Sequence, residues 1–321
     1  MNRLRSLPFL ALALLIPFSS ASAQPYPSHY IRIVTAGAGT MNDVITRRLA
    51  QRLQERLGQG VVVENQPAAG MTIAARIVAS AAPDGYTLLM GDSTSLAAAP
   101  SMYKNLGYDP VTSFRPITLV AVAPSILAVH PSVPAHTLAE FIEYTKQQKY
   151  SLLFASAGHG TMVHRAAEQL KLLTGADLLA VQYKGGGAAL LGVLAGEAKA
   201  TVLSAGVLMP YISEGKLRPI VLAARTRFAG APDLPTAAEA GLPEFVSEQW
   251  IGLLAPAGTP DAIIDKLNAE VVAFLNQEIG QILRAQGAEA RPGSPAEFAA
   301  FIAAETAKIG KIVEAAKLRI D

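Results

Sequence analysis

The sequence contains no cysteine in its 321 residues. This absence excludes disulfides, a thiol nucleophile and a lipid anchor carried by cysteine, so the fold must be stabilised by its core. Charged residues are also scarce, at 16% against about 25% in an average domain, whereas 51% of the residues are hydrophobic. At roughly 100 to 200 residues per domain, the length predicts two domains with sizeable cores.

The sequence also has little net charge and few metal ligands. It has 27 basic and 25 acidic residues, and Arg3 and Arg5, in an N-terminal segment without acids, account for the difference. A chain without that segment has no electrostatic reason to bind nucleic acid or an anionic membrane. The separation of five positions from His159 to His164 does not place both on one helix face, and no third ligand joins them, so we expect no metal site.

The N-terminus has the three parts of a secretory signal peptide. Arg3 and Arg5 form a basic start, residues 7–18 an apolar middle, and Ala21-Ser22-Ala23 a small-residue cleavage site. The apolar run contains two prolines and is shorter than the ~20 residues of a membrane span, which disfavours an uncleaved anchor. We therefore expect cleavage after Ala23, removal of residues 1–23, and a mature protein in the periplasm.

One hexapeptide occurs twice in the chain. Ala36-Gly37-Ala38-Gly39-Thr40-Met41 and Ala157-Gly158-His159-Gly160-Thr161-Met162 each stand between a strand-like run and a helix-like run. A glycine-rich turn in this position directs backbone N–H groups and the positive end of a helix dipole at one point, which suits an anion. Two such turns predict a clamp that holds a small carboxylate from both sides.

Short apolar strands alternate with amphipathic helices along the chain. The predicted strands are 30–34, 61–64, 86–90, 116–120, 126–129, 151–154, 179–182, 200–203 and 220–222. The predicted helices are 43–57, 72–81, 138–147, 163–173, 188–194, 260–275 and 295–316. This alternation predicts an α/β fold with mostly parallel strands, in which ligands bind at the carboxyl ends of the strands.

Two segments connect what we predict to be two lobes. Residues 114–123 leave the first lobe and residues 249–254 return to it. The first lobe then comprises residues 24–122 plus 250–321, and the second lobe comprises residues 123–249. This organisation predicts the two-lobed Venus flytrap fold of periplasmic binding proteins, of type II-like topology, with a hinge of two crossings.

The glycine turns have other interpretations. Gly37-x-Gly39 suggests a dinucleotide site, but Asn42 replaces the third glycine, so we expect no cofactor. The run Phe154-Ala155-Ser156-Ala157-Gly158 resembles the nucleophile elbow of a serine hydrolase. Phe154 replaces the usual first glycine, however, and no histidine follows His164 to act as the base. A secreted serine hydrolase remains the alternative from another class, and a purely structural turn remains a third interpretation.

Small polar residues near the strand ends are further candidate contacts. Thr40 and Asn42 both suit an N-cap, so one can cap the helix while the other reaches the ligand. Ser93 and Thr94 follow the strand 86–90 and offer hydroxyls, whereas Asp92 would repel an anion unless it caps a helix. A third glycine turn after the strand 179–182 contains Lys184 and Gly185, and Ser156 offers a hydroxyl in the second turn.

An ordered series of motifs extends over the whole predicted mature chain, at residues 31–34, Asp43, 61–65, 82–87, 108–110, 183–185, 214–217, 234–236, 239–243 and 252–260. In this combination the sequence resembles the substrate-binding receptors of tripartite tricarboxylate transporters, the Bug or TctC family. The resemblance implies a two-lobed, non-catalytic receptor that delivers a small carboxylate to membrane transporter subunits. A sensor that presents the solute to a signalling partner is the close alternative, and in either case we expect a monomer.

The chain departs from the family pattern at the expected ligand contacts. Gly37-Ala38 stand where the family has two prolines, and Val202-Leu203-Ser204 stand where it often has Phe-Asp-Asn. Without that acid an ammonium group has few partners, so we expect a ligand with an uncharged or apolar body. The predicted ligand-binding residues are Gly37, Gly39, Thr40, Asn42, Ser93, Thr94, Ser156, Gly158, His159, Gly160, Thr161, Lys184, Gly185 and Ser204.

Overall fold

The structure is a computed structural model that describes residues 26–66, 71–277 and 279–320. The predicted signal peptide, residues 1–23, lies outside these ranges. Within them, no helix combines the length and the apolar character that crossing a bilayer needs.

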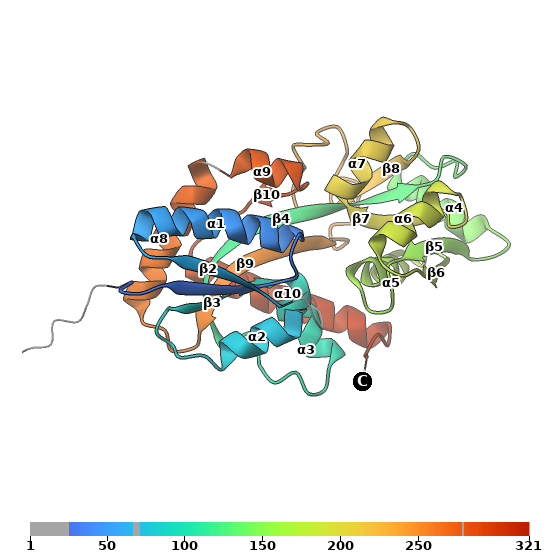
Figure 1. Cartoon of the computed structure of the whole chain (residues 1–321). Coiled ribbons are helices and arrows are strands. Elements are labelled where there is room, and N and C mark those ends of the chain that lie inside the picture. Colours follow the sequence, from blue (N-terminus) through green and yellow to red (C-terminus); the bar gives the residue numbers. More distant parts are fainter. Residues whose placement is uncertain (1–25, 67–70, 278, 321) are drawn as a thin grey trace, which may run out of the picture.

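Ten strands of the described chain form one mixed sheet that runs through both halves of the molecule (Figure 1). The strand order is β2-β1-β3-β9-β4-β7-β5-β6, and β10 and β8 also pair with β4. The strands are β1 (Ile31–Thr35), β2 (Val61–Asn65), β3 (Thr87–Asp92), β4 (Phe114–Val129), β5 (Leu152–Ser156), β6 (Leu178–Gln182), β7 (Ala200–Ser204), β8 (Arg218–Ala223), β9 (Glu248–Pro256) and β10 (Glu289–Ala290).

Strand β4 joins the two halves of the sheet. Up to Pro124 it pairs with β9, and from Ser125 onwards it pairs with β7 and β8. The sequence predicted separate strands at 116–120 and 126–129, whereas the structure has one strand. The residues between them are small or apolar and are buried, so nothing in this stretch interrupts the extended chain.

The prediction of mostly parallel strands is wrong. Strand β1 is parallel to β2 and β3, and β5 is parallel to β6 and β7. The five remaining pairings all involve β4 or β9 and are antiparallel, because these two strands carry the chain between the halves. The carboxyl ends of β1, β2 and β3 therefore share one edge of the sheet, and those of β5, β6 and β7 share another.

Helices cover both faces of the sheet (Figure 1). They are α1 (Met41–Leu57), α2 (Thr72–Ala79), the π-helix η2 (Thr94–Ala98), α3 (Ala99–Met102), α4 (Leu138–Gln147), α5 (Met162–Thr174), α6 (Gly186–Leu194), α7 (Ala205–Ser213), α8 (Asp261–Gln277), α9 (Gly280–Ala285) and α10 (Pro295–Ala315). Every predicted helix begins and ends within about two residues of an observed one. The sequence predictions omitted η2, α3, α7 and α9.

Local sequence signals explain why the predicted helix bounds agree with the observed ones. Thr137 and Ser294 start α4 and α10 with complete capping boxes, each closed by a glutamate three residues later. Gly58 and Gly175 end α1 and α5 in the left-handed conformation, which glycine adopts without steric cost. These local signals are sufficient to indicate where each of the helices begins or ends.

The described residues form three clusters of the hydrophobic core. One consists of buried residues between Ile126 and Phe245. The other two cover opposite faces of the β1–β3 and β9 region and contain residues before 124 and after 249. Each fully buried Leu, Ile or Phe side chain contributes about 1.5–3 kcal/mol relative to exposure. The core thus supplies the stabilisation that disulfides cannot give to a chain without cysteine.

Candidate functional site

The first glycine turn, residues 36–41, is closed by its own side chains. Thr40 is the N-cap of α1: its Oγ1 accepts from the Asp43 N–H at 3.3 Å and donates to the Gly37 carbonyl at 2.8 Å. The Gly39 N–H donates to Asp43 Oδ2 at 2.9 Å. Gly39 has φ of +79°, a conformation that favours glycine. One backbone N–H that the sequence assigned to the ligand is therefore paired with a carboxylate of the protein.

Asp43 is held by three donors. Besides Gly39, Asn65 Nδ2 donates to Oδ1 at 2.7 Å and Arg47 Nε lies 3.0 Å from the same oxygen. Burial acts to raise the pKa of Asp43, but the hydrogen bonds from Asn65, Gly39 and Arg47 outweigh it and hold the pKa below its ordinary value. Asp43 therefore stays ionised and fixes the turn to β2 through Asn65.

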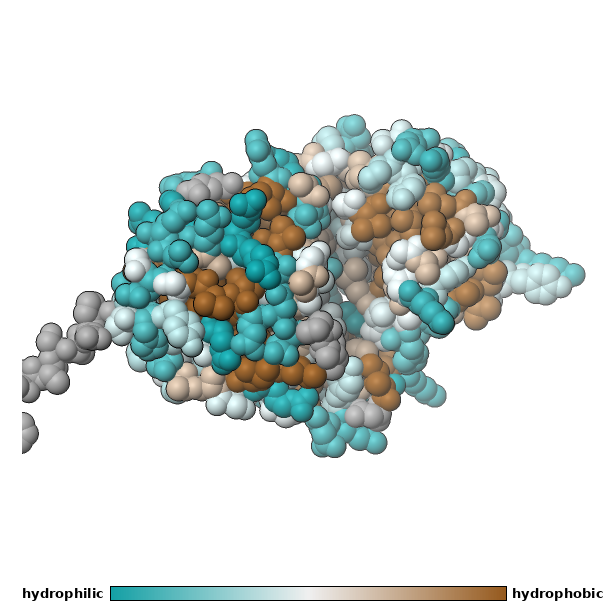
Figure 2. All heavy atoms as spheres, viewed as in Figure 1, coloured by the Kyte–Doolittle hydropathy of each residue, from teal (hydrophilic) through white to brown (hydrophobic). Residues whose placement is uncertain are grey.

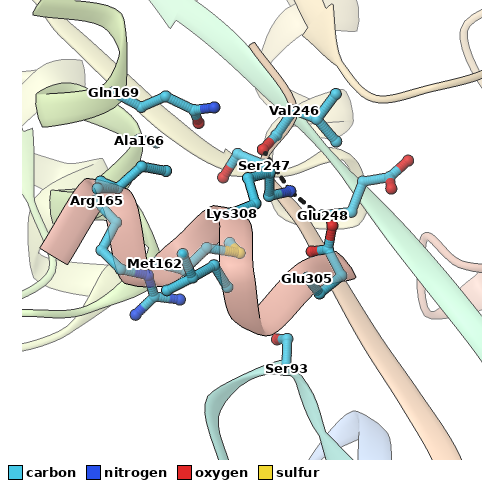
Figure 3. Close-up of a pocket in the computed structure, with 12 residues that line it drawn as sticks. Ser93, Met162, Arg165, Ala166, Gln169, Val246, Ser247, Glu248, Glu305 and Lys308 are labelled. Atoms are coloured by element: carbon cyan, nitrogen blue, oxygen red, sulfur yellow. Dashed lines mark hydrogen bonds and ion pairs between the residues drawn. The ribbon is translucent and has the colours of Figure 1, made fainter. Parts of the chain in front are cut away.

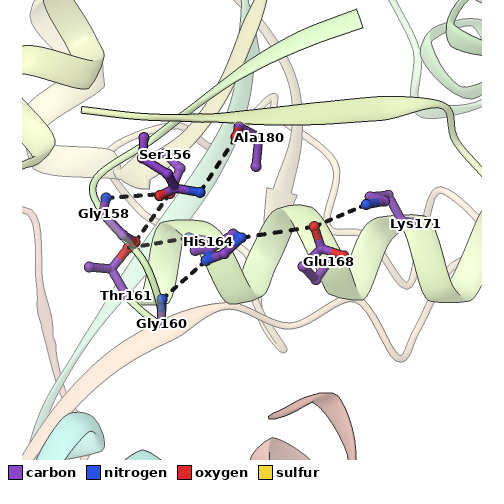
Figure 4. A network of polar contacts seen from close by, with 9 residues as sticks. Ser156, Gly158, Gly160, Thr161, His164, Glu168, Lys171 and Ala180 are labelled. Carbon is purple, nitrogen blue, oxygen red and sulfur yellow. Dashed lines mark hydrogen bonds and ion pairs between the residues drawn. The ribbon is translucent and has the colours of Figure 1, made fainter. Parts of the chain in front are cut away.

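The second glycine turn, residues 157–162, repeats this geometry (Figure 4). Thr161 caps α5, since its Oγ1 accepts from the His164 N–H at 3.3 Å and donates to the Gly158 carbonyl at 2.7 Å. The Gly160 N–H donates to His164 Nδ1 at 3.1 Å. Gly160, with φ of +69°, is buried: a Cβ there would lie 2.3 Å from Met102 Cε. The second turn thus packs against α3 of the first half of the molecule.

His164 takes the place that Asp43 has in the first turn. Burial lowers the pKa of His164, while the Glu168 carboxylate, 4.0 Å from its Nε2, acts in the opposite direction. His159 is exposed, and its ring centroid lies 5.1 Å from that of His164. Among the described residues, no group of three histidine or acidic side chains is placed to hold a metal ion.

Ser156 has no catalytic base beside it in the described chain. It is fully buried at the end of β5, where its Oγ donates to Gln182 Oε1 at 2.8 Å and accepts from the Gly158 N–H at 3.4 Å. His164 Nδ1 is the acceptor for Gly160. A serine nucleophile needs a base within hydrogen-bond reach, so this geometry does not support the hydrolase alternative.

The main pocket of the first half lies at the carboxyl ends of β1, β2 and β3. We call this cavity of about 570 Å³ the first-lobe pocket, and it is lined by Ala36, Gly37, Thr40, Met41, Asn42, Gln66, Met71, Asp92, Thr94 and Gln249. It brings together four predicted ligand contacts: Gly37, Thr40, Asn42 and Thr94. Figure 2 shows a hollow between the two halves of the molecule.

Asp92 lines the first-lobe pocket, although the sequence did not predict it as a contact. Its Oδ1 accepts from the N–H groups of Thr94 at 3.1 Å and Ser95 at 2.9 Å, and from Ser95 Oγ at 2.9 Å. Asp92 therefore caps η2, which is the helix-capping role that the sequence analysis allowed for it. Its Oδ2 accepts from Asn42 Nδ2 at 3.3 Å. Burial raises the pKa of Asp92, against the effect of these hydrogen bonds.

The predicted contacts of the second half gather at the carboxyl ends of β5, β6 and β7. The Gly185 N–H donates to the Ala157 carbonyl at 3.2 Å, which joins the third glycine turn to the second. Lys184 is exposed, and Ser204 is the half-buried residue before α7. None of these residues, and none of the second turn, lines the first-lobe pocket. The structure therefore presents two separate groups of candidates on the two halves.

Ser93 faces a different space from Thr94. It lines a small cavity of about 20 Å³ between α5 and α10, which we call the junction cavity (Figure 3). The other lining residues are Met162, Arg165, Ala166, Gln169, Val246, Ser247, Glu248, Glu305, Lys308, Ile309 and Ile312. A cavity of this size has room for about one water molecule, so Ser93 is placed at a packed junction and not in a ligand pocket.

Charged side chains connect the two halves around the junction cavity. Arg225, which follows β8, pairs with Glu248 Oε2 and with Glu305 Oε1, each at 2.5 Å, and Lys308 Nζ lies 2.8 Å from Glu305. Burial lowers the pKa of Arg165 to about 10, while Asp92 and Glu305 act to raise it. Arg165 Nη1 donates to the Gly160 carbonyl at 2.7 Å, so this buried cation also fixes the second turn.

The fold and the two glycine turns define the class of protein: a two-lobed solute-binding protein with the periplasmic-binding-protein fold. The chain matches the model of the tripartite tricarboxylate transporter family receptor over residues 45–318. It belongs to this family, which confirms the resemblance seen in the sequence. Members of the family are solute-binding receptors of the periplasm.

Relatives and solved structures agree with this assignment. Protein BugT of Bordetella pertussis is 33% identical over 295 residues, which cover 91% of this chain and 90% of that one. The structure titled R. palustris Rpa4515 with adipate is 32% identical, with a TM-score of 0.75, and the match covers 92% of this chain and 99% of that one. MatC from Rhodopseudomonas palustris with bound malate is 34% identical, with a TM-score of 0.71 and coverage of 90% and 100%.

Proposed function

We propose that the protein captures a small carboxylate between its two lobes and delivers it, without catalysis, to a tripartite transporter in the membrane. The observation that carries the proposal is the first-lobe pocket, which gathers Gly37, Thr40, Asn42 and Thr94 at the carboxyl ends of three parallel strands. The adipate and malate in the two solved neighbours support a carboxylate as the ligand. In this proposal the mature protein acts in the periplasm after cleavage at Ala23.

The second turn supplies the other side of the clamp. In the proposal the lobes are residues 24–122 plus 250–321 and residues 123–249, and they close about a hinge at 121–124 and 249–251. These segments are paired in β4 and β9, so bending of two neighbouring strands suffices to move one lobe against the other. A ligand that contacts both lobes favours the closed form by its additional contacts there.

A thermal-shift screen against mono-, di- and tricarboxylates tests the proposal. A ligand that binds only the folded state adds about 2.7 kcal/mol of stability at a hundredfold excess over Kd. We expect at least one carboxylate to raise Tm and to reduce the radius of gyration in solution scattering. Chromogenic esters serve as the control and should not be hydrolysed. If no carboxylate raises Tm, or if ester turnover is found, the proposal is wrong.

A further inference from the structure

Asp92, which lines the first-lobe pocket, has one carboxylate oxygen that accepts fewer hydrogen bonds than it can. Oδ1 already accepts three hydrogen bonds from Thr94 and Ser95. Within the described part of the chain, Asn42 alone donates to Oδ2, and its Nδ2 also lies 3.3 Å from Met71 Sδ. A carboxylate oxygen accepts about two hydrogen bonds, so Oδ2 has capacity for another donor.

The first-lobe pocket can supply this donor. Asp92 is 7% exposed, and both Asp92 and Asn42, the partner of Oδ2, line the cavity, so a solute bound there would lie beside this carboxylate. Asp92 forms no ion pair within 4.0 Å in the residues that the structure describes. A buried acceptor that loses water without gaining a donor costs roughly 1–3 kcal/mol, and more when it is charged. A ligand without a donor at this position would leave that cost uncompensated.

We propose that Asp92 selects carboxylates that carry a hydrogen-bond donor, a hydroxyl or an ammonium group, close to the carboxylate that the glycine turns hold. This inference rests on the proposed function and names the ligand class for the same pocket. It refines the expectation of a ligand with an uncharged or apolar body, which followed from the missing acid at the end of β7 and took no account of Asp92. The cap of η2 uses only one of the two oxygens of Asp92.

Matched ligands test the selection on the purified protein. Succinate, malate and aspartate share four carbons and differ in a hydrogen, a hydroxyl or an ammonium group; glutarate, 2-hydroxyglutarate and glutamate form the five-carbon set. For the skeleton that binds, we expect the hydroxyl or the ammonium member to bind about tenfold to a hundredfold more tightly than the unsubstituted acid in calorimetry. The comparison of these two members shows which donor Asp92 receives.

The Asp92→Asn variant assigns the preference to this residue. Asparagine keeps the Oδ1 acceptor that caps η2 but replaces the second oxygen by a donor. We expect it to abolish the preference for the substituted acid, which is read as the ratio of the two affinities within one ligand set, because the loss of a negative charge beside the bound carboxylate acts on both members alike. The control is Asp84→Asn, an equal change of charge at the exposed turn before β3, where, among the residues that the structure describes, the carboxylate accepts only from the Tyr86 N–H. This control should retain the preference.

The outcomes separate this inference from the proposed function. Equal affinities within each ligand set, or an Asp92→Asn variant that weakens all members equally, overturn the role of Asp92 and leave carboxylate capture standing. Absence of binding by any carboxylate overturns the proposed function itself. A Tm measurement of each variant without ligand shows that it is folded, so a loss of selectivity is not confused with unfolding.

Discussion

The two glycine turns share their hydrogen bonds and differ in one acceptor. In both, a threonine caps the helix at 3.3 Å and also bonds the carbonyl of the first glycine. The second glycine donates to a carboxylate, Asp43, in the first turn and to an imidazole, His164, in the second. The repeated hexapeptide therefore sets the backbone path, and the residue two positions beyond it sets the charge.

This difference bears on anion binding. Asp43 already accepts from the Gly39 N–H and adds negative charge beside the first turn, which Arg47 partly offsets. His164 adds no negative charge to the second turn, and burial favours its neutral form. Two turns of nearly identical sequence thus have different electrostatic environments. The following predictions test this comparison.

Removal of the side chain that accepts from the second glycine should cause the largest loss of stability. The loss should be larger in the first turn than in the second. Asp43→Ala leaves Gly39, Asn65 and Arg47 without their shared partner, and we expect a loss of about 3 kcal/mol in the free energy of unfolding. His164→Ala leaves one N–H unpaired and should cost about 1.5 kcal/mol. Urea denaturation measures both, with the exposed Asp233→Ala as the control, expected within about 0.5 kcal/mol of wild type. Equal losses would show that the carboxylate does not distinguish the turns.

Replacement of the second glycine of each turn by alanine should lower the stability by different amounts, because the two positions are packed differently. Both Gly39→Ala and Gly160→Ala place a side chain in the left-handed region, at about 1 kcal/mol or more. No atom lies within 4 Å of a Cβ at Gly39, whereas a Cβ at Gly160 meets Met102 Cε at 2.3 Å. We expect Gly160→Ala to cost about 1 kcal/mol more, since the buried Met102 must move. In a Met102→Ala background this excess should vanish, and an unchanged excess would contradict the assignment to Met102.

The stability that each turn contributes should fall in a different pH range. The folded pKa of Asp43 is lowered, so its contribution is present above its unfolded pKa near 4 and is lost as the pH falls through the folded value. The folded pKa of His164 is also lowered, so its contribution is complete above about 6.5 and declines as the pH falls below that. Urea denaturation between pH 8 and 3 should therefore show the His164→Gln difference shrinking first and the Asp43→Asn difference at lower pH. The opposite order would contradict the assignment of the higher pH range to His164 and the lower one to Asp43.

Removal of the threonine caps should give the smallest difference in stability between the two turns. Thr40→Ala and Thr161→Ala each remove an N-cap, which typically costs about 1 kcal/mol. Because the cap distances are equal in the two turns, the two losses should agree within about 0.3 kcal/mol in urea denaturation. Thr40→Ser and Thr161→Ser keep the hydroxyl and should restore most of the stability. A clear difference between the alanine variants would mean that the turns are less alike than their hydrogen bonds indicate.

The sequence predicted the local elements better than their pairing. Caps such as Ser294 and terminal glycines such as Gly58 act within a few residues, so the helix bounds follow from the printed order of residues. The direction of β4 and β9 depends on partners far along the chain, and alternation alone suggested parallel strands. The family resemblance and the two-lobed fold were nevertheless correct, because the glycine turns and the ordered motifs are spread over residues 31–260.

The candidate site was predicted only in part for the same reason. Gly37, Thr40, Asn42 and Thr94 follow strand ends that share one edge, so they were expected to meet. The contact of Gly160 with Met102 and the bond from Ser156 to Gln182 join residues that no local pattern relates. Asp92 was recognised as a possible cap, but a cap and a pocket wall are not exclusive roles for a group with two oxygens.

Trp250 gives the protein an optical reporter at the crossing between the lobes. It is the only tryptophan in the sequence, it is fully buried, and it pairs with Val122 in the strands β4 and β9. Its ring lies edge-on to Phe298 and Phe301, and its Nε1 has no hydrogen-bond partner in the described chain. An indole in such surroundings fluoresces at short wavelength, and all of the emission comes from one place. Any bending of these strands can thus be followed spectroscopically in the unlabelled protein.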